Sequence, residues 1–330
     1  MTILVLGQAE VEALLPMEEC LAVMERAFAA LARGQVVQPV RVRVQPPGGG
    51  GLMLAMPAYV APDGAAPFYG LKAVLVHPGN AARGLESHQG AVLLFSGETG
   101  EPLAVMNAAA ITAIRTAAVS GLATRLLARD DAGDCAIIGA GVQARSHLAA
   151  MAAARSLRRV RVAGRSADNV RRLVETSQPG APFPIEAAAS VAEAVRGADI
   201  IVTATSATEP VLRRDWIAPG THINAVGAYT PATREIDAAT VAAARLFVDQ
   251  RESALSEAGE VILPMQAGAF GPEHIQAELG ELVIGSRPGR GSAEEITLFK
   301  SLGLPVEDAA AAEHVYRKAV ERGAGTAVAF

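Results

Sequence analysis

Hydrophobic and polar positions alternate in the first third of the chain, as in β-strands. In residues 40–44 three valines face one way and Arg41 and Arg43 face the other, and the glycine-rich segment 46–51 predicts a hairpin tip. Further strands are predicted at 52–59, 68–76, 90–95 and 102–106. Because turns rather than helices separate these strands, the pattern predicts an antiparallel sheet.

Helical periodicity flanks these strands on both sides. Residues 6–15 and 16–33 are predicted to be helical, and Gly34 is expected to end the second helix. Residues 107–129 predict one long helix with an apolar face, which leads into the next region. The last segment, residues 294–330, is predicted to be helical and to return to the first region.

The middle of the chain has a different pattern, in which short apolar runs alternate with helix-compatible sequence. The predicted strands are 136–138, 160–163, 200–205, 221–226 and 246–248. This βαβ order predicts a parallel sheet with right-handed crossovers. The predicted fold class is therefore α/β, with a Rossmann-type domain at 118–303 and an α+β domain formed by 1–117 with 304–330.

Composition narrows the class of protein. The chain has 330 residues, of which 51% are hydrophobic and 19% charged, which excludes a disordered chain. Its net charge of −5 offers no basic face for nucleic acid. The two cysteines, Cys20 and Cys135, are too few for a disulfide framework. Arg115 and Arg125 interrupt the longest apolar stretch, so no membrane span is expected, and with no secretory signal we expect a cytoplasmic protein.

A glycine turn after the first strand of the parallel region predicts a nucleotide site. Gly139 permits a tight turn, Gly141 lets a pyrophosphate approach the backbone, and Ala144 allows the following helix to pack closely on the strand. Val142 and Gln143 begin that helix, whose N-terminus offers free N–H groups to phosphate. The alternative is a purely structural βα turn.

The second strand of this region bears on the choice of cofactor. It ends in Gly164-Arg165-Ser166, with no acidic residue for a ribose 2′-hydroxyl, so NADPH is predicted to be preferred, with NADH possible. Alternatively, Arg165 is a solvated residue and Ser166 is a helix N-cap. Thr203, Val226 and Gly227 lie at the ends of later strands and complete the predicted cofactor site.

Three cations are candidates for binding a small carboxylate. Arg41 lies on the polar side of a strand, Lys72 lies in an apolar strand, and Arg115 interrupts an apolar helix. For each residue taken alone, a structural ion pair is the simpler interpretation, but together they suggest a carboxylate site. The histidines have no paired spacing, so no metal site is predicted, and no G-x-S-x-G motif indicates a hydrolase.

Several segments resemble the ornithine cyclodeaminase/mu-crystallin family, in order and over nearly the whole chain. They are residues 38–41, 87–89, 111–120, 139–144, 223–227 and 297–303. The resemblance implies a homodimer, with a dimerisation and substrate domain built from the N-terminal region and the C-terminal helix, and a Rossmann domain between these segments. It also implies a carboxylate clamp at the residues matching Arg41, Lys72 and Arg115.

One position separates branches of this family. Where the cyclodeaminases carry an aspartate, two residues after the glycine of the Val226-Gly227 turn, this chain has Tyr229, which is not a base at neutral pH. The sequence therefore looks more like the ketimine reductase branch, which reduces Δ1-pyrroline-2-carboxylate or Δ1-piperideine-2-carboxylate to L-proline or L-pipecolate. The imine proton could come from solution, from Lys72 or from a water. Ornithine cyclodeaminase, alanine dehydrogenase and a non-enzymatic NADP-dependent binding protein remain alternatives.

Overall fold

The structure of the protein is a computed structural model that describes residues 2–85 and 87–330. The chain divides into two compact units, Met1–Thr116 with Gly303–Phe330, and Ala117–Leu302. The predicted boundaries followed residues 117 and 303, whereas the observed ones follow residues 116 and 302, a difference of one residue each. We describe each unit by itself and call them the first and second unit.

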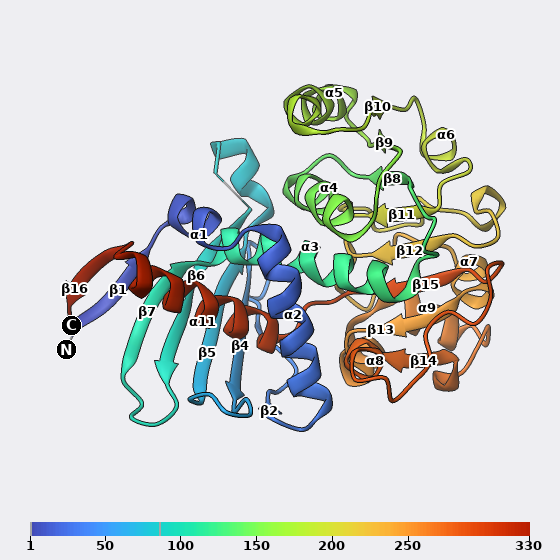
Figure 1. Cartoon of the computed structure of the whole chain (residues 1–330). Helices are drawn as coiled ribbons and strands as arrows, with labels where there is room; N and C mark the ends of the chain where they lie inside the picture. Colours follow the sequence, from blue (N-terminus) through green and yellow to red (C-terminus); the bar gives the residue numbers. More distant parts are fainter. Residues whose placement is uncertain (1, 86) are drawn as a thin grey trace. The chain divides into compact units, whose positions relative to one another are not determined.

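The first unit is a sheet with helices packed on one face (Figure 1). Its strands are β1 (Thr2–Leu6), β2 (Val36–Val37), β3 (Val42–Val44), β4 (Leu52–Val60), β5 (Phe68–Val76), β6 (His88–Ser96), β7 (Pro102–Asn107) and β16 (Thr326–Ala329). Its helices are α1 (Gln8–Leu14), α2 (Met17–Ala32), the short 3₁₀ segment Pro78–Arg83 and α11 (Pro305–Arg322), and α3 (Ala108–Leu127) runs through the boundary. The strand order is β16-β1-β7-β6-β5-β4-β2, with β3 paired to β4.

The strands predicted between residues 40 and 106 pair antiparallel as expected, but the complete sheet is mixed. β1, which the sequence pattern did not predict, pairs parallel with β7, and Leu4 lies opposite Ala104. The segment 294–330 is not helical throughout either: it contains a strand at Thr297–Lys300, then α11, then β16, which pairs with β1. These pairings join distant parts of the chain, and local periodicity carries no information about them.

The strand predicted at 40–44 is shorter than predicted. Only Val42–Val44 forms a strand, and Val42 and Val44 are 51% and 57% exposed. β3 pairs with β4 outside the main path of the sheet. The glycine-rich hairpin between β3 and β4 is confirmed, because the two strands pair antiparallel from Val44 opposite Met53.

The second unit contains the predicted parallel sheet, in the order β10-β9-β8-β11-β12-β15-β13-β14. The strands are β8 (Asp134–Ile138), β9 (Arg159–Ala163), β10 (Ile185–Ala187), β11 (Ile200–Thr203), β12 (His222–Ala225), β13 (Arg245–Val248), β14 (Ile275–Glu278) and β15 (Thr297–Lys300). Its helices include α4 (Val142–Ala154), α5 (Ala167–Ser177), α6 (Val191–Val195), α7 (Ala238–Ala243), α8 (Arg251–Glu257), α9 (Gly259–Gln266) and α10 (Leu279–Val283). All neighbouring strands pair parallel, which confirms the α/β class.

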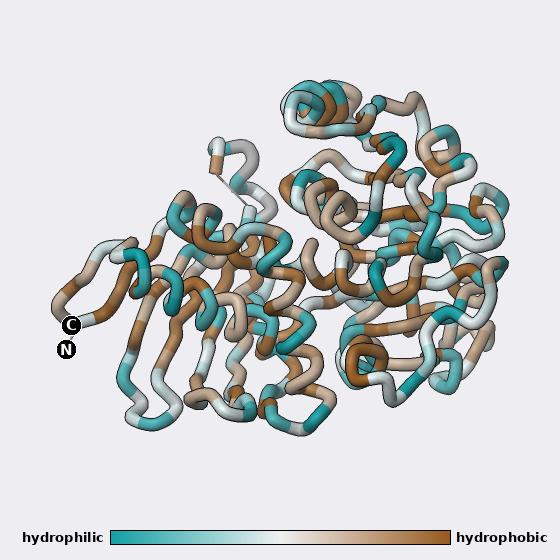
Figure 2. The backbone as a smooth tube through the Cα atoms, in the orientation of Figure 1, coloured by the Kyte–Doolittle hydropathy of each residue, from teal (hydrophilic) through white to brown (hydrophobic). Residues whose placement is uncertain are grey.

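The strands of the second unit are buried between the helices and carry its apolar core (Figure 2). Ile137, Ile201, Ile223 and Leu246 are fully buried. The sequence analysis did not predict the short strands β10, β14 and β15. Both cysteines are buried and free, Cys20 in α2 and Cys135 in β8.

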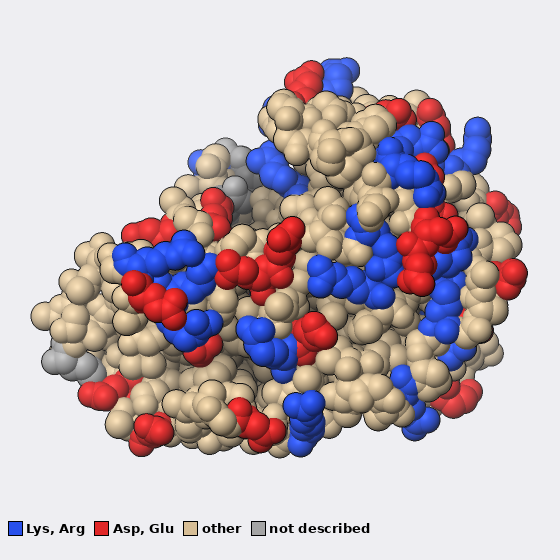
Figure 3. Space-filling view, viewed as in Figure 1, with Lys and Arg blue, Asp and Glu red and all other residues tan. Residues whose placement is uncertain are grey.

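Charged residues of both signs are mixed on the face seen in Figure 3. Arg155 has a structural role, because it donates to the carbonyl oxygens of Arg125, Ala128 and Arg129 at the end of α3. In the part of the chain that the structure describes, no helix is both long and apolar enough to cross a membrane.

Candidate active site

The predicted glycine turn lies between β8 and α4, at the carboxyl edge of the parallel sheet. Gly139 has φ of +125°, and a Cβ there would lie 2.9 Å from the carbonyl carbon of Ala204. Its N–H donates to Ala163 O at 2.8 Å. Only glycine combines this backbone conformation with so close an approach, so the turn draws the ends of β8, β9 and β11 together.

The start of α4 is open in the way that a phosphate site requires. A Cβ at Gly141 would meet no atom within 4 Å, and no side chain caps the helix at this residue. Val142 is 55% exposed, Gln143 follows it in the first turn, and Ala144 is fully buried against the sheet. The backbone N–H groups of this turn and the positive end of the helix fit a pyrophosphate.

Arg165 and Ser166 form the turn between β9 and α5. Ser166 is the N-cap of α5, and its Oγ accepts from the Asn169 N–H at 3.3 Å. Arg165 is exposed. The structural interpretation of Ser166 is therefore confirmed, while contact of either residue with a 2′-phosphate stays a prediction.

Thr203 and Gly227, at the ends of β11 and β12, are brought together by a carboxylate that the sequence analysis missed. Glu235 is fully buried, and its Oε2 accepts from Thr203 Oγ1 at 2.9 Å and from the Gly227 N–H at 2.6 Å. Its Oε1 accepts from both the N–H and the hydroxyl of Thr205 at 2.7 Å. Val226 is joined to the same edge, since its N–H donates to Thr203 O.

The three predicted cations lie together in the first unit, around the start of α11. Lys72 Nζ on β5 lies 2.7 Å from Asp308 Oδ2, and Arg115 Nε on α3 lies 2.9 Å from Asp308 Oδ1. Arg115 Nη1 is 2.5 Å from Glu307 Oε2. Arg41 donates to the carbonyl oxygen of Gly303 at 2.9 Å.

Gly303 explains how two arginines fit at one place. Its φ is +82°, and a Cβ there would lie 2.5 Å from Nη1 and 3.1 Å from Nη2 of Arg115. The missing side chain thus leaves room for the Arg115 guanidinium, while the carbonyl group of Gly303 accepts from Arg41. We call Arg41, Lys72, Arg115, Glu307 and Asp308 the cation cluster.

Burial makes the charges of this cluster interact strongly. Lys72 and Arg115 are 2% and 3% exposed, and Asp308 is 1% exposed. Desolvation, and next the nearby Arg115, lower the pKa of Lys72 to about 8, although Asp308 opposes the shift. Desolvation acts against the charged Arg115 too, but Asp308 and Glu307 outweigh it and raise the pKa of that guanidinium.

The cations of the cluster suit an anionic ligand, because guanidinium and ammonium groups bind carboxylates through charge-assisted hydrogen bonds. The sequence analysis missed Glu307 and Asp308. Two adjacent acids in an otherwise alanine-rich helix segment were a usable signal, because acidic residues are rarely buried without partners.

Tyr229 follows β12 and contributes no carboxylate. Its side chain is half-buried and packs against the apolar core of the second unit. Among the residues that the structure describes, no group of three or more histidine, cysteine, aspartate or glutamate residues could hold a metal ion.

A Rossmann-type sheet with an open glycine turn after its first strand is typical of nicotinamide-dependent oxidoreductases. The family model of the ornithine cyclodeaminase/mu-crystallin family matches residues 1–323. The chain therefore belongs to this family, as the sequence segments predicted.

Three known proteins show the extent of the similarity. The ketimine reductase mu-crystallin of Mus musculus is 43% identical over 296 residues, which are 89% of this chain and 90% of the mouse protein. The Δ1-pyrroline-2-carboxylate reductase of Thermococcus litoralis, solved with NADH and L-proline, is 41% identical, with a TM-score of 0.94 over 98% of this chain and 99% of that one. An archaeal alanine dehydrogenase dimer with bound NAD is 35% identical, with a TM-score of 0.93 over the full length of both chains.

Proposed function

We propose that this protein is a ketimine reductase that uses NADPH, and NADH less well, to reduce Δ1-pyrroline-2-carboxylate or Δ1-piperideine-2-carboxylate to L-proline or L-pipecolate. The single observation that carries the proposal is the cation cluster, in which Arg41 and the buried Lys72 and Arg115 lie together around the start of α11. The similarity to a reductase that was solved with NADH and L-proline supports the same substrate class.

The cluster would hold the substrate by its carboxylate. Arg41 and Arg115 are suited to charge-assisted hydrogen bonds with the carboxylate oxygens. Arg115 keeps its own geometry because Glu307 and Asp308 bind two of its nitrogens. A fixed guanidinium loses little freedom on binding the substrate, so the free energy of the contact goes into positioning C2 of the imine.

Reduction also needs a proton on the imine nitrogen, and we assign its delivery to Lys72. When bound, the nicotinamide cofactor supplies the hydride that C2 accepts. A pKa of about 8 leaves Lys72 mostly protonated at pH 7 and still able to release its proton. Asp308 Oδ2 holds the ammonium group in place at 2.7 Å.

The glycine turn would hold the pyrophosphate of the cofactor. The open space at Gly141 and the uncapped N-terminus of α4 fit the phosphates. Gly139, Val142, Gln143 and Ala144 would complete the turn, and Thr203, Val226 and Gly227 would bound the nicotinamide side. At Arg165 and Ser166 a cation and a hydroxyl, with no acid, support the preference for NADPH.

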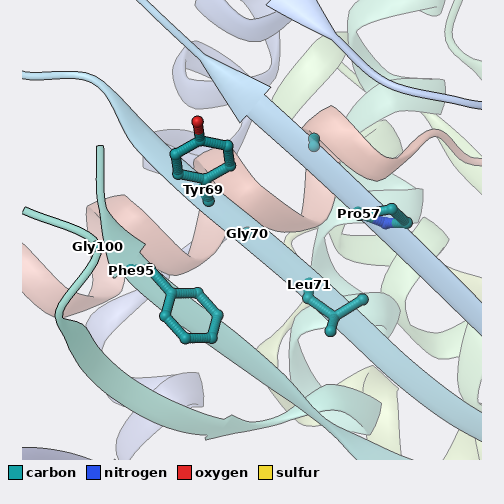
Figure 4. A pocket seen from close by; sticks show the side chains of 7 residues that line it. Pro57, Tyr69, Gly70, Leu71, Phe95 and Gly100 are labelled. Carbon is teal, nitrogen blue, oxygen red and sulfur yellow. The ribbon is translucent and has the colours of Figure 1, made fainter. Parts of the chain in front are cut away.

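We further propose that the protein acts as a homodimer through the outward face of the first unit's sheet. Tyr69, Leu71 and Phe95 project from β5 and β6 on the side away from α11, around a hollow that Pro57 also lines (Figure 4). Tyr69 and Leu75 are each 48% exposed. Apolar side chains so exposed on one sheet face are typical of a subunit interface.

One assay panel tests the proposed activity. Oxidation of NADPH and NADH would be followed with pyrroline-2-carboxylate, piperideine-2-carboxylate, and pyruvate plus ammonia, and ammonia release would be measured with ornithine. We expect rapid turnover of a cyclic imine with NADPH and negligible ammonia from ornithine, because Tyr229 provides no base. Robust conversion of ornithine to proline and ammonia would overturn the proposal. Turnover of pyruvate with ammonia alone would assign an alanine dehydrogenase instead.

A further inference from the structure

Glu235 makes an unusual set of contacts for a buried carboxylate. Its two oxygens accept four hydrogen bonds, from the side chains of Thr203 and Thr205 and from the backbone N–H groups of Thr205 and Gly227. All four donors lie at the end of β11 or just after β11 and β12, and none lies in a helix. The carboxylate thus ties together two loops at the carboxyl edge of the sheet.

A second buried charge holds the same loop from its other side. Lys300 Nζ, on β15, donates to the carbonyl oxygen of Ala228 at 2.5 Å and lies 3.2 Å from Glu260 Oε2. Glu260 Oε1 in turn accepts from the Glu235 N–H at 2.9 Å. Gly227 and Ala228 are therefore held by their N–H and their carbonyl group, through Glu235 and Lys300.

Such an arrangement is costly if its only purpose is to fold the domain. Glu235, Glu260 and Lys300 have no exposed surface, and burying charged groups is unfavourable even when they are paired. Desolvation raises the pKa of Glu235, although Lys300 and the hydrogen bonds from Thr205 oppose the shift. Apolar side chains of similar size would fill this space at lower cost, so the charges point to a requirement for exact loop position.

Sheet topology places these loops beside one half of a bound dinucleotide. The strand order reverses between β8 and β11, and a dinucleotide binds across such a switch point. The adenosine half would lie over β8 and β9, where Arg165 follows the second strand. The loops after β11 and β12 then face the nicotinamide half.

From these contacts we infer that Glu235 is a positioning residue for the nicotinamide ring. It sets the path of residues 203–205 and 226–228, which would bound the ring, and it touches neither the substrate nor the cofactor itself. The inference rests on the proposed function, because it requires a bound nicotinamide dinucleotide. A close steric fit supports the inference. A Cβ at Gly227 would lie 2.6 Å from both Thr205 N and Glu235 Oε1, so the two loops are tightly packed against each other.

The test compares whole dinucleotides with fragments that lack nicotinamide, in the full-length protein. Glu235→Gln replaces one accepting oxygen by an NH₂ group. The threonine hydroxyl on that side can turn and accept from the NH₂, but the backbone N–H of Thr205 or of Gly227 loses its acceptor. We expect the dissociation constants of NADPH and NADH to rise about tenfold or more. Those of 2′-phospho-ADP-ribose and ADP-ribose should change less than about twofold, because the adenosine half does not depend on these loops.

Two further variants guard against a general loss of structure. Thr205→Val removes one donor and leaves Glu235 in place, and it should weaken dinucleotide binding about threefold in the same selective manner. Asp199→Asn is the matched control. Asp199 also accepts from two backbone N–H groups, those of Gly133 and Asp134. It lies just before β11, however, and so at the opposite edge of the sheet. Asp199→Asn should lower the melting temperature, and it should not raise the dissociation constants of the dinucleotides more than those of the fragments.

The outcomes distinguish this inference from the proposed function. If the unmodified protein binds neither NADPH nor NADH, the proposed function and the inference both fall. If the unmodified protein binds them, and Glu235→Gln and Thr205→Val weaken dinucleotides and fragments equally or leave both unchanged, the inference alone is overturned.

Discussion

Lys72 shows how a single residue can be both a structural ion-pair partner and a candidate acid. Its ammonium group lies 2.7 Å from Asp308 and is 2% exposed, so the simple structural interpretation of this lysine is correct as far as it goes. The same burial, with Arg115 nearby, lowers its pKa to about 8. A lysine with that pKa can exchange a proton near neutral pH, which an exposed lysine does poorly.

We therefore predict that kcat/KM for the cyclic imine falls as the pH rises through about 8. Below that pH Lys72 carries the proton to be donated, and above it the free enzyme loses the donor form. In Lys72→Arg the fall near pH 8 should disappear and kcat/KM should be lower at every pH, because a guanidinium stays protonated and does not release its proton in this range. A fall that stays at the same pH in this variant would belong to the substrate and would contradict the role of Lys72.

Arg115 should contribute to both catalysis and stability. Arg115→Ala removes a contact to the substrate carboxylate, and we expect kcat/KM to fall by about 2–4 kcal/mol in transition-state terms. It also leaves Glu307 and Asp308 buried with one cation fewer, which should lower the free energy of unfolding by about 3–5 kcal/mol. Steady-state kinetics and urea unfolding measure the two effects. A stability loss with unchanged kinetics would make Arg115 purely structural.

At the scale of elements, the contact between β5 and α11 sets the geometry of the cation cluster. Lys72 and Gly70 lie on the buried side of β5, facing α11, which carries Glu307 and Asp308. A Cβ at Gly70 would lie 2.7 Å from the Cα of Ala309, next to Asp308. The strand and the helix approach so closely only because residue 70 is glycine.

Gly70→Ala should therefore push α11 away from the sheet. We expect the free energy of unfolding to fall by about 1–3 kcal/mol, the usual cost of overpacking, and kcat/KM to fall as well because Asp308 moves relative to Lys72. Gly180→Ala is a suitable control, since a Cβ there would meet no atom within 4 Å and its φ is not positive. It should change stability by less than about 0.5 kcal/mol. Equal effects of the two substitutions would contradict this explanation.

The turn between β9 and α5 should decide between the two cofactors. Arg165→Ala should raise KM for NADPH about tenfold or more and KM for NADH less than about twofold, because only NADPH carries the 2′-phosphate. Arg172→Ala, at an exposed arginine in the body of α5, is the control and should change neither. If both KM values rise equally in Arg165→Ala, Arg165 does not bind the phosphate.

At the scale of the whole molecule, the outward face of the first unit's sheet should bury itself in a dimer. Leu75 lies opposite Met53 on neighbouring strands, and both are partly exposed. An isologous contact between two such faces would cover them without an open-ended assembly.

Leu75→Glu should shift the protein to a monomer in sedimentation experiments, because a carboxylate placed in an apolar interface is left unpaired. The monomer should stay folded, since Leu75 is already 48% exposed in the isolated chain. Val320→Glu, at a 61% exposed position on α11, serves as the control and should remain dimeric. A dimer in both variants would place the interface elsewhere.

Local sequence patterns determined the class of this fold. The alternation of apolar runs and helices predicted the parallel sheet. Gly139 and Gly141 marked the turn at its carboxyl edge, because a strand ends and a helix begins within a few residues there. The three cations also stood out in sequence, since Lys72 and Arg115 interrupt apolar segments and buried charges need a reason.

The tertiary structure decided what depends on contacts between distant segments. No local pattern tells that β1 pairs with β7, or that 297–300 is a strand. Likewise, the partners of the predicted residues lie far along the chain: Asp308 is 193 residues from Arg115, and Glu235 is 32 residues from Thr203. Periodicity indicates which side of an element is buried. The hydrogen-bond and ion-pair partners of a residue are set only when the elements pack, because they depend on distances in space that sequence spacing does not contain.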